Sequence, residues 1–146
     1  AKKIFKLDKV IWAITKKNPY KKNSSLNLKE RISYAKKISL KNKFIKIGFY
    51  EDKIKSNKTI NLIKFFIKKN KNTEIYFIMG ADNLINFHKW EKYNLIPGLC
   101  KILVFDRDGY KSKSLKSLSF KKYNNKSLEF IKFKKVKISS SQLRKI

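Results

Sequence analysis

Two polar segments of the chain contain residue types that could hold a ligand. The first is GADN, Gly80 to Asn83, which follows an apolar run and is itself followed by FHKW. Gly80 lets the backbone turn sharply and approach a ligand, and Asp82 could accept hydrogen bonds from ribose hydroxyls or cap the next helix. On the residues alone, helix capping is the stronger interpretation of Asp82.

The aromatic end of this segment is also open to two interpretations. Trp90 could stack on a base or another aromatic ring, whereas a tryptophan at helical spacing from Phe87 more often packs in a core. His88 is interpreted as a surface or supporting group rather than a catalyst, because no cysteine or serine nucleophile accompanies it. The single cysteine excludes an internal disulfide, and one cysteine with one histidine cannot build a structural zinc site, so we expect no metal site of this kind.

The second segment is ISSSQLR, which ends at Arg144. Serine hydroxyls and backbone N–H groups at a helix start form an anion site, to which Arg144 adds charge one turn on. The alternative is an ordinary helix N-cap followed by an arginine, and the residues alone slightly favour it. Two further polar positions follow apolar runs, namely TKKNPYK and Glu51.

Apolar runs and amphipathic repeats predict the elements that position these residues. The helix predicted over residues 26–40 places Leu28, Ile32, Ala35 and Ile38 on one stripe, with Asn27 as its cap. The segment 109–127 has the weakest periodicity and is predicted to be a surface excursion, with a short helix within it as the alternative. Strands are predicted at 9–15, 43–51, 74–79, 101–108 and 128–138, and further helices at 58–70, 83–87 and from residue 90.

Strands that alternate with helices and are apolar on both faces predict a parallel sheet flanked by helices. The fold class is therefore α/β, with a Rossmann-like architecture. Ligands of such sheets bind beyond the carboxyl ends of the strands, which is where the polar segments fall. The length of 146 residues predicts one domain over residues 1–146.

The net charge of +28 suggests an anionic partner, but the composition weakens that argument. Only three of the 38 basic residues are arginine, the residue that phosphate-clamping surfaces favour. Lysine, isoleucine and asparagine share A/T-rich codons, so compositional drift explains the charge better than nucleic-acid binding does. The absence of a long apolar run predicts a cytoplasmic protein with no membrane partner.

Seven segments in chain order resemble the successive motifs of bacterial nicotinate-nucleotide adenylyltransferases. The most specific are G-A-D-N-L with F-H-x-W following, and I-S-S-[ST]-x-[IL]-R. The resemblance covers almost the whole chain. The segments are LDKVIWAITKKNPYK, LKERISYAKK, IKIGFYE, KTINLI, IYFIMGADNLINFHKW, ILVFDRDGY and ISSSQLR.

This resemblance implies transfer of the adenylyl group of ATP to nicotinate mononucleotide, which gives the dinucleotide precursor of NAD and pyrophosphate. Mg²⁺ is expected to accompany the ATP, and NAD is a product of the pathway rather than a cofactor. The resemblance places Gly80 and Asp82 at a nucleotide ribose, Trp90 on the nicotinate ring and Thr59 near that ring. It assigns the ATP phosphates to Ser139, Ser140, Ser141 and Arg144, with Lys21, Arg31 and His88 as weaker candidates.

The family pattern begins with a strand, a glycine-rich turn and an H-x-G-H motif, which this sequence does not contain. We therefore expect a domain that is truncated at both ends relative to the family and lacks its first strand. The catalytic residues stay unassigned, and the chain is expected to be inactive and marginally stable. One alternative is a related nucleotidyltransferase with another acceptor, such as phosphopantetheine. Another is a noncatalytic basic protein that binds RNA or other polyanions through its lysines.

Overall fold

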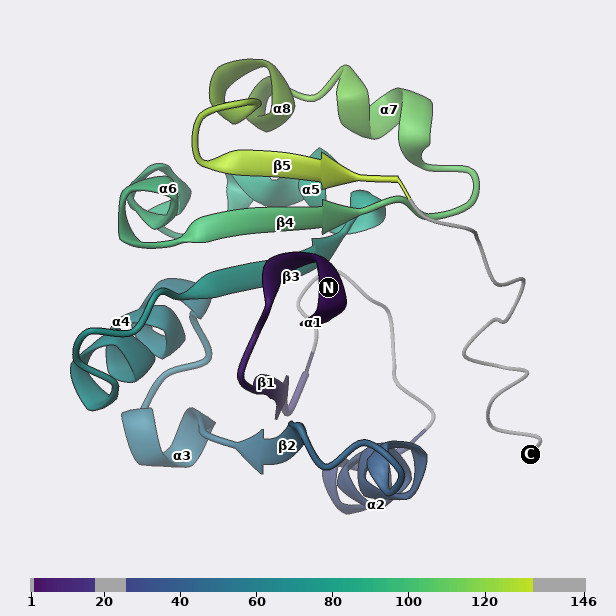
Figure 1. The fold of residues 1–146 in the computed structure, drawn as a ribbon, viewed down its shortest axis with the longest axis vertical. Helices are drawn as coiled ribbons and strands as arrows, with labels where there is room; N and C mark the ends of the chain where they lie inside the picture. The colour runs from purple at the N-terminus through teal and green to yellow at the C-terminus, as the bar shows by residue number, and fades with distance from the viewer. Residues whose placement is uncertain (1, 18–25, 133–146) are drawn as a thin grey trace. The chain divides into compact units, whose positions relative to one another are not determined.

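The computed structural model describes residues 2–17 and 26–132, which belong to two compact units. The first unit covers residues 1–62 and the second covers residues 63–146. Each unit is built of parallel strands and helices, as the alternating sequence pattern predicts (Figure 1). The described strands form two sheets rather than the single sheet expected. The single domain over residues 1–146 stays a prediction.

In the first unit, a two-stranded parallel sheet pairs Val10 with Ile45 and Ile14 with Phe49. Short apolar runs rich in β-branched residues favour these strands. Helix α2 packs against both of them. The elements are α1 (Lys2–Phe5), β1 (Val10–Ile14), α2 (Leu28–Ser39), β2 (Ile45–Phe49), α3 (Glu51–Ile54) and the start of α4 (Thr59–Lys69).

The cap predicted for α2 is confirmed, and its buried face is shifted. Asn27 Oδ1 accepts a hydrogen bond from Glu30 N and Glu30 Oε2 accepts one from Asn27 N, both at 2.9 Å, which is a complete capping box. Ala35 is buried as predicted, but Ile38 is 50% exposed and Ser39 is buried instead. Ser39 lies four residues after Ala35 on the same line of the helix, so the prediction for Ile38 was wrong by one position.

The second unit contains a three-stranded parallel sheet in the order β3-β4-β5. The middle strand β4 buries Ile102, Leu103 and Val104 in succession, as expected of a strand covered on both faces. Helix α5 packs against β3 and β4, and it also contacts α7 and α8. The elements are β3 (Tyr76–Gly80), α5 (Ala81–Asn86), η1 (Phe87–Lys89), η2 (Tyr93–Leu95), α6 (Ile96–Leu99), β4 (Lys101–Phe105), α7 (Lys111–Leu115), α8 (Leu118–Tyr123) and β5 (Leu128–Ile131).

The segment predicted as a surface excursion instead forms two short helices, α7 and α8, in line with the alternative of a short helix within it. Ser114 and Ser119 are buried within it, at 0% and 1% exposure. Ser117 caps α8, because its Oγ accepts a hydrogen bond from Phe120 N at 3.2 Å. Serine at inward-facing positions hides the apolar periodicity on which the sequence prediction depends. Among residues 2–17 and 26–132, every helix is too short or too polar to span a membrane.

Candidate active site

The end of β3 places Gly80 and Asp82 in direct contact. Gly80 has φ −84° and ψ 157°, which any residue can adopt, so a sharp turn is not the reason for a glycine here. A Cβ atom at Gly80 would lie 2.5 Å from Oδ1 of Asp82. The glycine therefore leaves the space into which the carboxylate of Asp82 folds back.

Asp82 does not cap α5, so the capping interpretation of this residue was wrong. Gly80 occupies the cap position, and Asp82 lies inside the first turn. Its Oδ2 accepts a hydrogen bond from Nη1 of Arg107 at 2.6 Å, and its side chain is only 15% exposed. Its Oδ1 is buried and has no hydrogen-bond partner among the residues that the structure describes.

Sequence analysis did not identify Arg107, although strand pairing explains its position. Gly80 pairs with Phe105 at the ends of the adjacent parallel strands β3 and β4. Asp82 and Arg107 each lie two residues beyond that pair, so the two strands deliver opposite charges to the same edge of the sheet. The strand predicted over residues 101–108 included Arg107, so the equal offsets of these two opposite charges became visible only once β4 was seen to end at Phe105.

Trp90 packs against two phenylalanine rings. Its ring meets Phe87 at 5.3 Å and Phe77 at 6.0 Å between centroids, both edge to face. Phe87 is fully buried, whereas Trp90 and His88 are half-buried. The indole Nε1 of Trp90 and Nδ1 of His88 are buried without a hydrogen-bond partner in the described part of the chain. Trp90 therefore packs against the core on one side and keeps part of its surface exposed.

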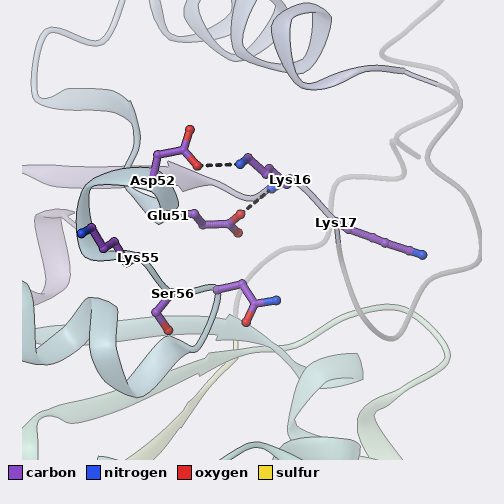
Figure 2. A pocket seen from close by; sticks show the side chains of 7 residues that line it. Lys16, Lys17, Glu51, Asp52, Lys55 and Ser56 are labelled. Carbon is purple, nitrogen blue, oxygen red and sulfur yellow. Dashed lines mark hydrogen bonds and ion pairs between the residues drawn. The ribbon is translucent and has the colours of Figure 1, made fainter.

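In the first unit, a cavity of about 510 Å³ lies beyond the ends of β1 and β2 (Figure 2). Ammonium groups and carboxylates both contribute to its walls, so the cavity suits a ligand with charged and polar groups. It contains Glu51, one of the positions expected at a strand end. Its lining residues are Lys16, Lys17, Glu51, Asp52, Lys55, Ser56 and Asn57.

Lys16 is fixed at three points on one side of this cavity. Its backbone N–H donates to Glu51 Oε2 at 3.2 Å, and its Nζ lies 2.5 Å from Oδ1 of Asp52 (Figure 2). Its carbonyl oxygen accepts a hydrogen bond from Nη2 of Arg31 at 2.6 Å. The hydrogen bond to Asp52 raises the pKa of the Lys16 ammonium group. Arg31, predicted as a phosphate contact, is thus engaged with the main chain of Lys16.

Of the other predicted site residues, only Thr59 lies within the described part of the chain. Thr59 is the first residue of α4 and is half-buried; it belongs to the first unit, whereas Gly80, Asp82 and Trp90 belong to the second. Among the described residues, no group of three or more His, Cys, Asp or Glu side chains is arranged to hold a metal ion. Lys21, Ser139, Ser140, Ser141 and Arg144 lie outside the described residues.

Comparisons with known proteins agree on one family. The family model described as cytidylyltransferase-like matches residues 1–146. A relative from Pelagibacter ubique, named "Probable nicotinate-nucleotide adenylyltransferase", is 62% identical over all of this chain and 81% of its own length. A relative of the same name from Rhizobium meliloti is 35% identical over 104 residues, which are 70% of this chain and 55% of that protein.

Solved structures support the fold. The nicotinic acid mononucleotide adenylyltransferase of Plasmodium falciparum, complexed with APC, superposes with a TM-score of 0.68 at 19% identity, over 95% of this chain and 68% of that one. Its complex with NaAD gives a TM-score of 0.66 at 18% identity, over 95% and 69%. These likenesses confirm the Rossmann-like α/β fold class.

The matches also bear on the alternative interpretations of the sequence. Neither the expected truncation nor the alternative of a noncatalytic polyanion-binding protein is borne out. The predicted resemblance is confirmed by a 62% identical relative that aligns with every residue of the chain. The chain belongs to the cytidylyltransferase-like family and, within it, to the nicotinate-nucleotide adenylyltransferases.

Proposed function

We propose that this protein transfers the adenylyl group of ATP to nicotinate mononucleotide, giving nicotinate adenine dinucleotide and pyrophosphate for NAD synthesis. The observation that carries the proposal is the 62% identity to the Pelagibacter ubique relative over the whole of this chain. The phosphate of nicotinate mononucleotide attacks the α-phosphorus of ATP, and the bond to pyrophosphate breaks. No covalent enzyme intermediate forms.

Positioning and charge stabilisation supply the catalysis in such an in-line transfer. The strand ends contribute residues suited to both tasks. In the first unit, Lys17 and Lys55 line one cavity with ammonium groups that can attract phosphate oxygens. Mg²⁺ enters with the triphosphate of ATP, as part of the substrate, and neutralises charge on its oxygens.

The site residues keep the roles that the family resemblance implies, with one change. Asp82 accepts a hydrogen bond from a ribose hydroxyl beside Gly80, and Trp90 stacks on the nicotinate ring. Thr59 keeps only the assignment that the resemblance gives it. The half-buried indole packs perpendicular to the rings of Phe77 and Phe87, which supports the stacking role because the ring needs little ordering on binding. Arg31 supports Lys16 instead of contacting phosphate. The ATP phosphates are assigned to Ser139, Ser140, Ser141 and Arg144, with Lys21 and His88 as supporting groups.

Calorimetric titration with nicotinate mononucleotide and with nicotinate adenine dinucleotide at moderate salt tests this proposal. The unaltered protein should bind both saturably, and Trp90→Ala should weaken binding by about tenfold or more, because stacking on an aromatic side chain contributes about 1–3 kcal/mol per ring. Trp12→Ala is the matched control, since Trp12 lies in β1, is 41% exposed and has no assigned role. Its dissociation constants should match those of the unaltered protein.

The alternatives predict different titrations. A related transferase with another acceptor would bind phosphopantetheine in preference to nicotinate mononucleotide. A polyanion-binding protein would bind RNA with an affinity that falls steeply with salt, and it would bind neither pyridine nucleotide saturably. Either result would overturn the proposed function, and release of pyrophosphate that requires both ATP and nicotinate mononucleotide would support it.

A further inference from the structure

The ion pair between Asp82 and Arg107 connects a proposed ligand-binding residue to a residue with no assigned role. The Nη1–Oδ2 distance is 2.6 Å. The pair follows from the strand register, because both residues lie two positions beyond the paired ends of β3 and β4. Any ligand at the carboxyl ends of these two strands lies close to this pair.

The two oxygens of the Asp82 carboxylate have different surroundings. Oδ1 is turned inward, into the space left by the missing Cβ of Gly80, where it is buried. Oδ2 accepts the hydrogen bond from Arg107. A carboxylate oxygen can accept two hydrogen bonds, so Oδ2 retains a lone pair for a ligand hydroxyl while Arg107 occupies the other.

Arg107 is itself held from a second side. The N–H of Tyr110 donates to the carbonyl oxygen of Arg107 at 3.0 Å, which closes a turn. Gly109 has φ +79° within that turn, a conformation that favours glycine. The turn brings the Tyr110 ring to 5.8 Å from the guanidinium carbon of Arg107, within the range of a cation–π contact. The guanidinium group is therefore restrained before any ligand arrives.

We propose that Arg107 is a positioning residue, which holds the Asp82 carboxylate so that Oδ2 accepts a ribose hydroxyl of a bound nucleotide. Without the guanidinium group, the carboxylate can rotate and its accepting oxygen loses its fixed direction. Arg107 acts through Asp82 and does not need to touch the ligand. This inference rests on the proposed function, since it requires a nucleotide at the end of β3.

The test measures the coupling between Arg107 and a single hydroxyl group of the ligand. Dissociation constants are measured by calorimetry for ATP and for nicotinate mononucleotide, each alongside its 2′-deoxy and 3′-deoxy analogues. The protein variants are Arg107→Gln, Arg107→Lys and Asp82→Asn. Lys111→Gln removes an equal charge from the neighbouring helix α7 and serves as the matched control. Urea unfolding of each variant shows whether it is folded.

Arg107→Gln should weaken binding of one of the two ribonucleotides by about tenfold, which is the usual size of a hydrogen bond to a charged group. The penalty should shrink to less than about twofold for the analogue that lacks the accepted hydroxyl. Arg107→Lys should recover part of the affinity, because it restores a cation at the pair. Adding Arg107→Gln to Asp82→Asn should weaken binding little further, since the charged carboxylate that Arg107 holds is already absent.

Two results would overturn the inference while leaving the proposed function intact. One is an equal penalty for ribose and deoxyribose ligands, which would mean that Arg107 contacts the nucleotide elsewhere. The other is unchanged binding by a folded Arg107→Gln variant. If the unaltered protein binds neither nucleotide saturably, the proposed function fails and this inference fails with it. If Arg107→Gln does not fold, Arg107→Lys and Asp82→Asn are compared across the same analogues. Penalties in both variants that depend on the same hydroxyl group support the inference, and penalties that do not depend on it overturn the inference.

Discussion

The two units hold their strand-end residues by different means. In the first unit, Lys16 is fixed by hydrogen bonds and an ion pair, and the described residues of this unit contribute three of the buried apolar side chains: Ile14, Ala35 and Ile60. The second unit contributes the other twelve, with Phe87 and β4 at the centre of its core. Polar links therefore order the first site, whereas the ion pair of Asp82 and Arg107 in the second unit is backed by a larger apolar core.

This difference predicts unequal local stability. Fully burying a large apolar side chain stabilises a fold by about 1.5–3 kcal/mol, whereas an exposed ion pair contributes about 0–1 kcal/mol. The backbone amides of β1 and β2 should therefore exchange with solvent faster than those of β4. The following changes test the contrast, beginning with the largest expected effect.

Replacing Phe87 with alanine should be the most damaging of these changes. Its side chain is fully buried and meets the rings of Trp90 and Tyr93 at 5.3 and 5.7 Å. Removing such a ring costs about 3–5 kcal/mol, through lost burial and the cavity left behind. Urea unfolding followed by the exchange of β4 amides measures the loss. Leu118→Ala is the control, because Leu118 is 66% exposed, and an equal loss there would contradict a core centred on Phe87.

Cys100 reports whether the second core excludes water. Burial raises the pKa of its thiol to about 11, and its Sγ lies 3.6 Å from the carbonyl oxygen of Ile96. The folded state favours the neutral thiol, so this contribution to stability is complete below pH 9 and is lost as the pH rises towards 11, by roughly 1.4 kcal/mol per unit. Cys100→Ala should lose this dependence.

Alkylation provides an independent measurement at Cys100. At pH 8, iodoacetamide should react with the folded protein roughly a hundredfold more slowly than with the chain in guanidinium chloride, because the thiolate fraction is lower in the folded state. Equal rates would mean that water reaches the thiol, and the contrast between the two units would then be smaller than the burial of their side chains indicates.

The sequence predicted the features that depend on neighbours along the chain. Apolar runs located the five strands of the described residues, and Asn27 marked the start of α2. The features it missed depend on contacts between distant segments. The partner of Arg107 is set by the register of β3 against β4, and the partner of Arg31 is a backbone carbonyl, which no sequence pattern displays.

Replacing Gly48 with alanine tests the first unit through its packing rather than through its charges. A Cβ atom there would lie 2.5 Å from the hydroxyl oxygen of Tyr50 and 2.6 Å from its ring. Gly48→Ala should therefore destabilise the protein by roughly 1–2 kcal/mol, as overpacking does. Gly98→Ala is the control, since nothing lies within 4 Å of its added Cβ atom. Thermal melts that shifted equally for both variants would mean that the Tyr50 ring moves aside freely.

Arg31→Gln tests the polar links of the first unit directly. The change removes the hydrogen bond from Arg31 Nη2 to the carbonyl oxygen of Lys16. The expected loss is about 1 kcal/mol, because the bond is charged but accessible to water. Hydrogen exchange at Lys16 and Lys17 should also become faster. Lys29→Gln changes the same charge on the same helix and should have almost no effect; similar losses in both variants would assign the effect to net charge.

Glu74→Gln makes a comparable change on the surface of the second unit and should have the smallest effect. Glu74 Oε1 lies 2.7 Å from Lys101 Nζ, and its Oε2 accepts a hydrogen bond from the Tyr76 hydroxyl at 2.8 Å. The hydrogen bonds from Lys101 and Tyr76 lower the pKa of this carboxyl group. Its contribution to stability is therefore present above the ordinary pKa of a glutamate and is lost as the pH falls through the lowered value.

Glu129→Gln is the control for Glu74, because Glu129 is an exposed carboxylate in β5 of the same unit. Melting temperatures between pH 3 and pH 7 should separate the two variants only above the lowered pKa of Glu74. If polar links matter most where apolar burial is scarce, the loss for Glu74→Gln stays below that for Arg31→Gln. A larger loss of stability for Glu74→Gln than for Arg31→Gln would mean that packing around Phe87 does not suffice to hold β3 against β4. The second unit would then also depend on its surface ion pairs.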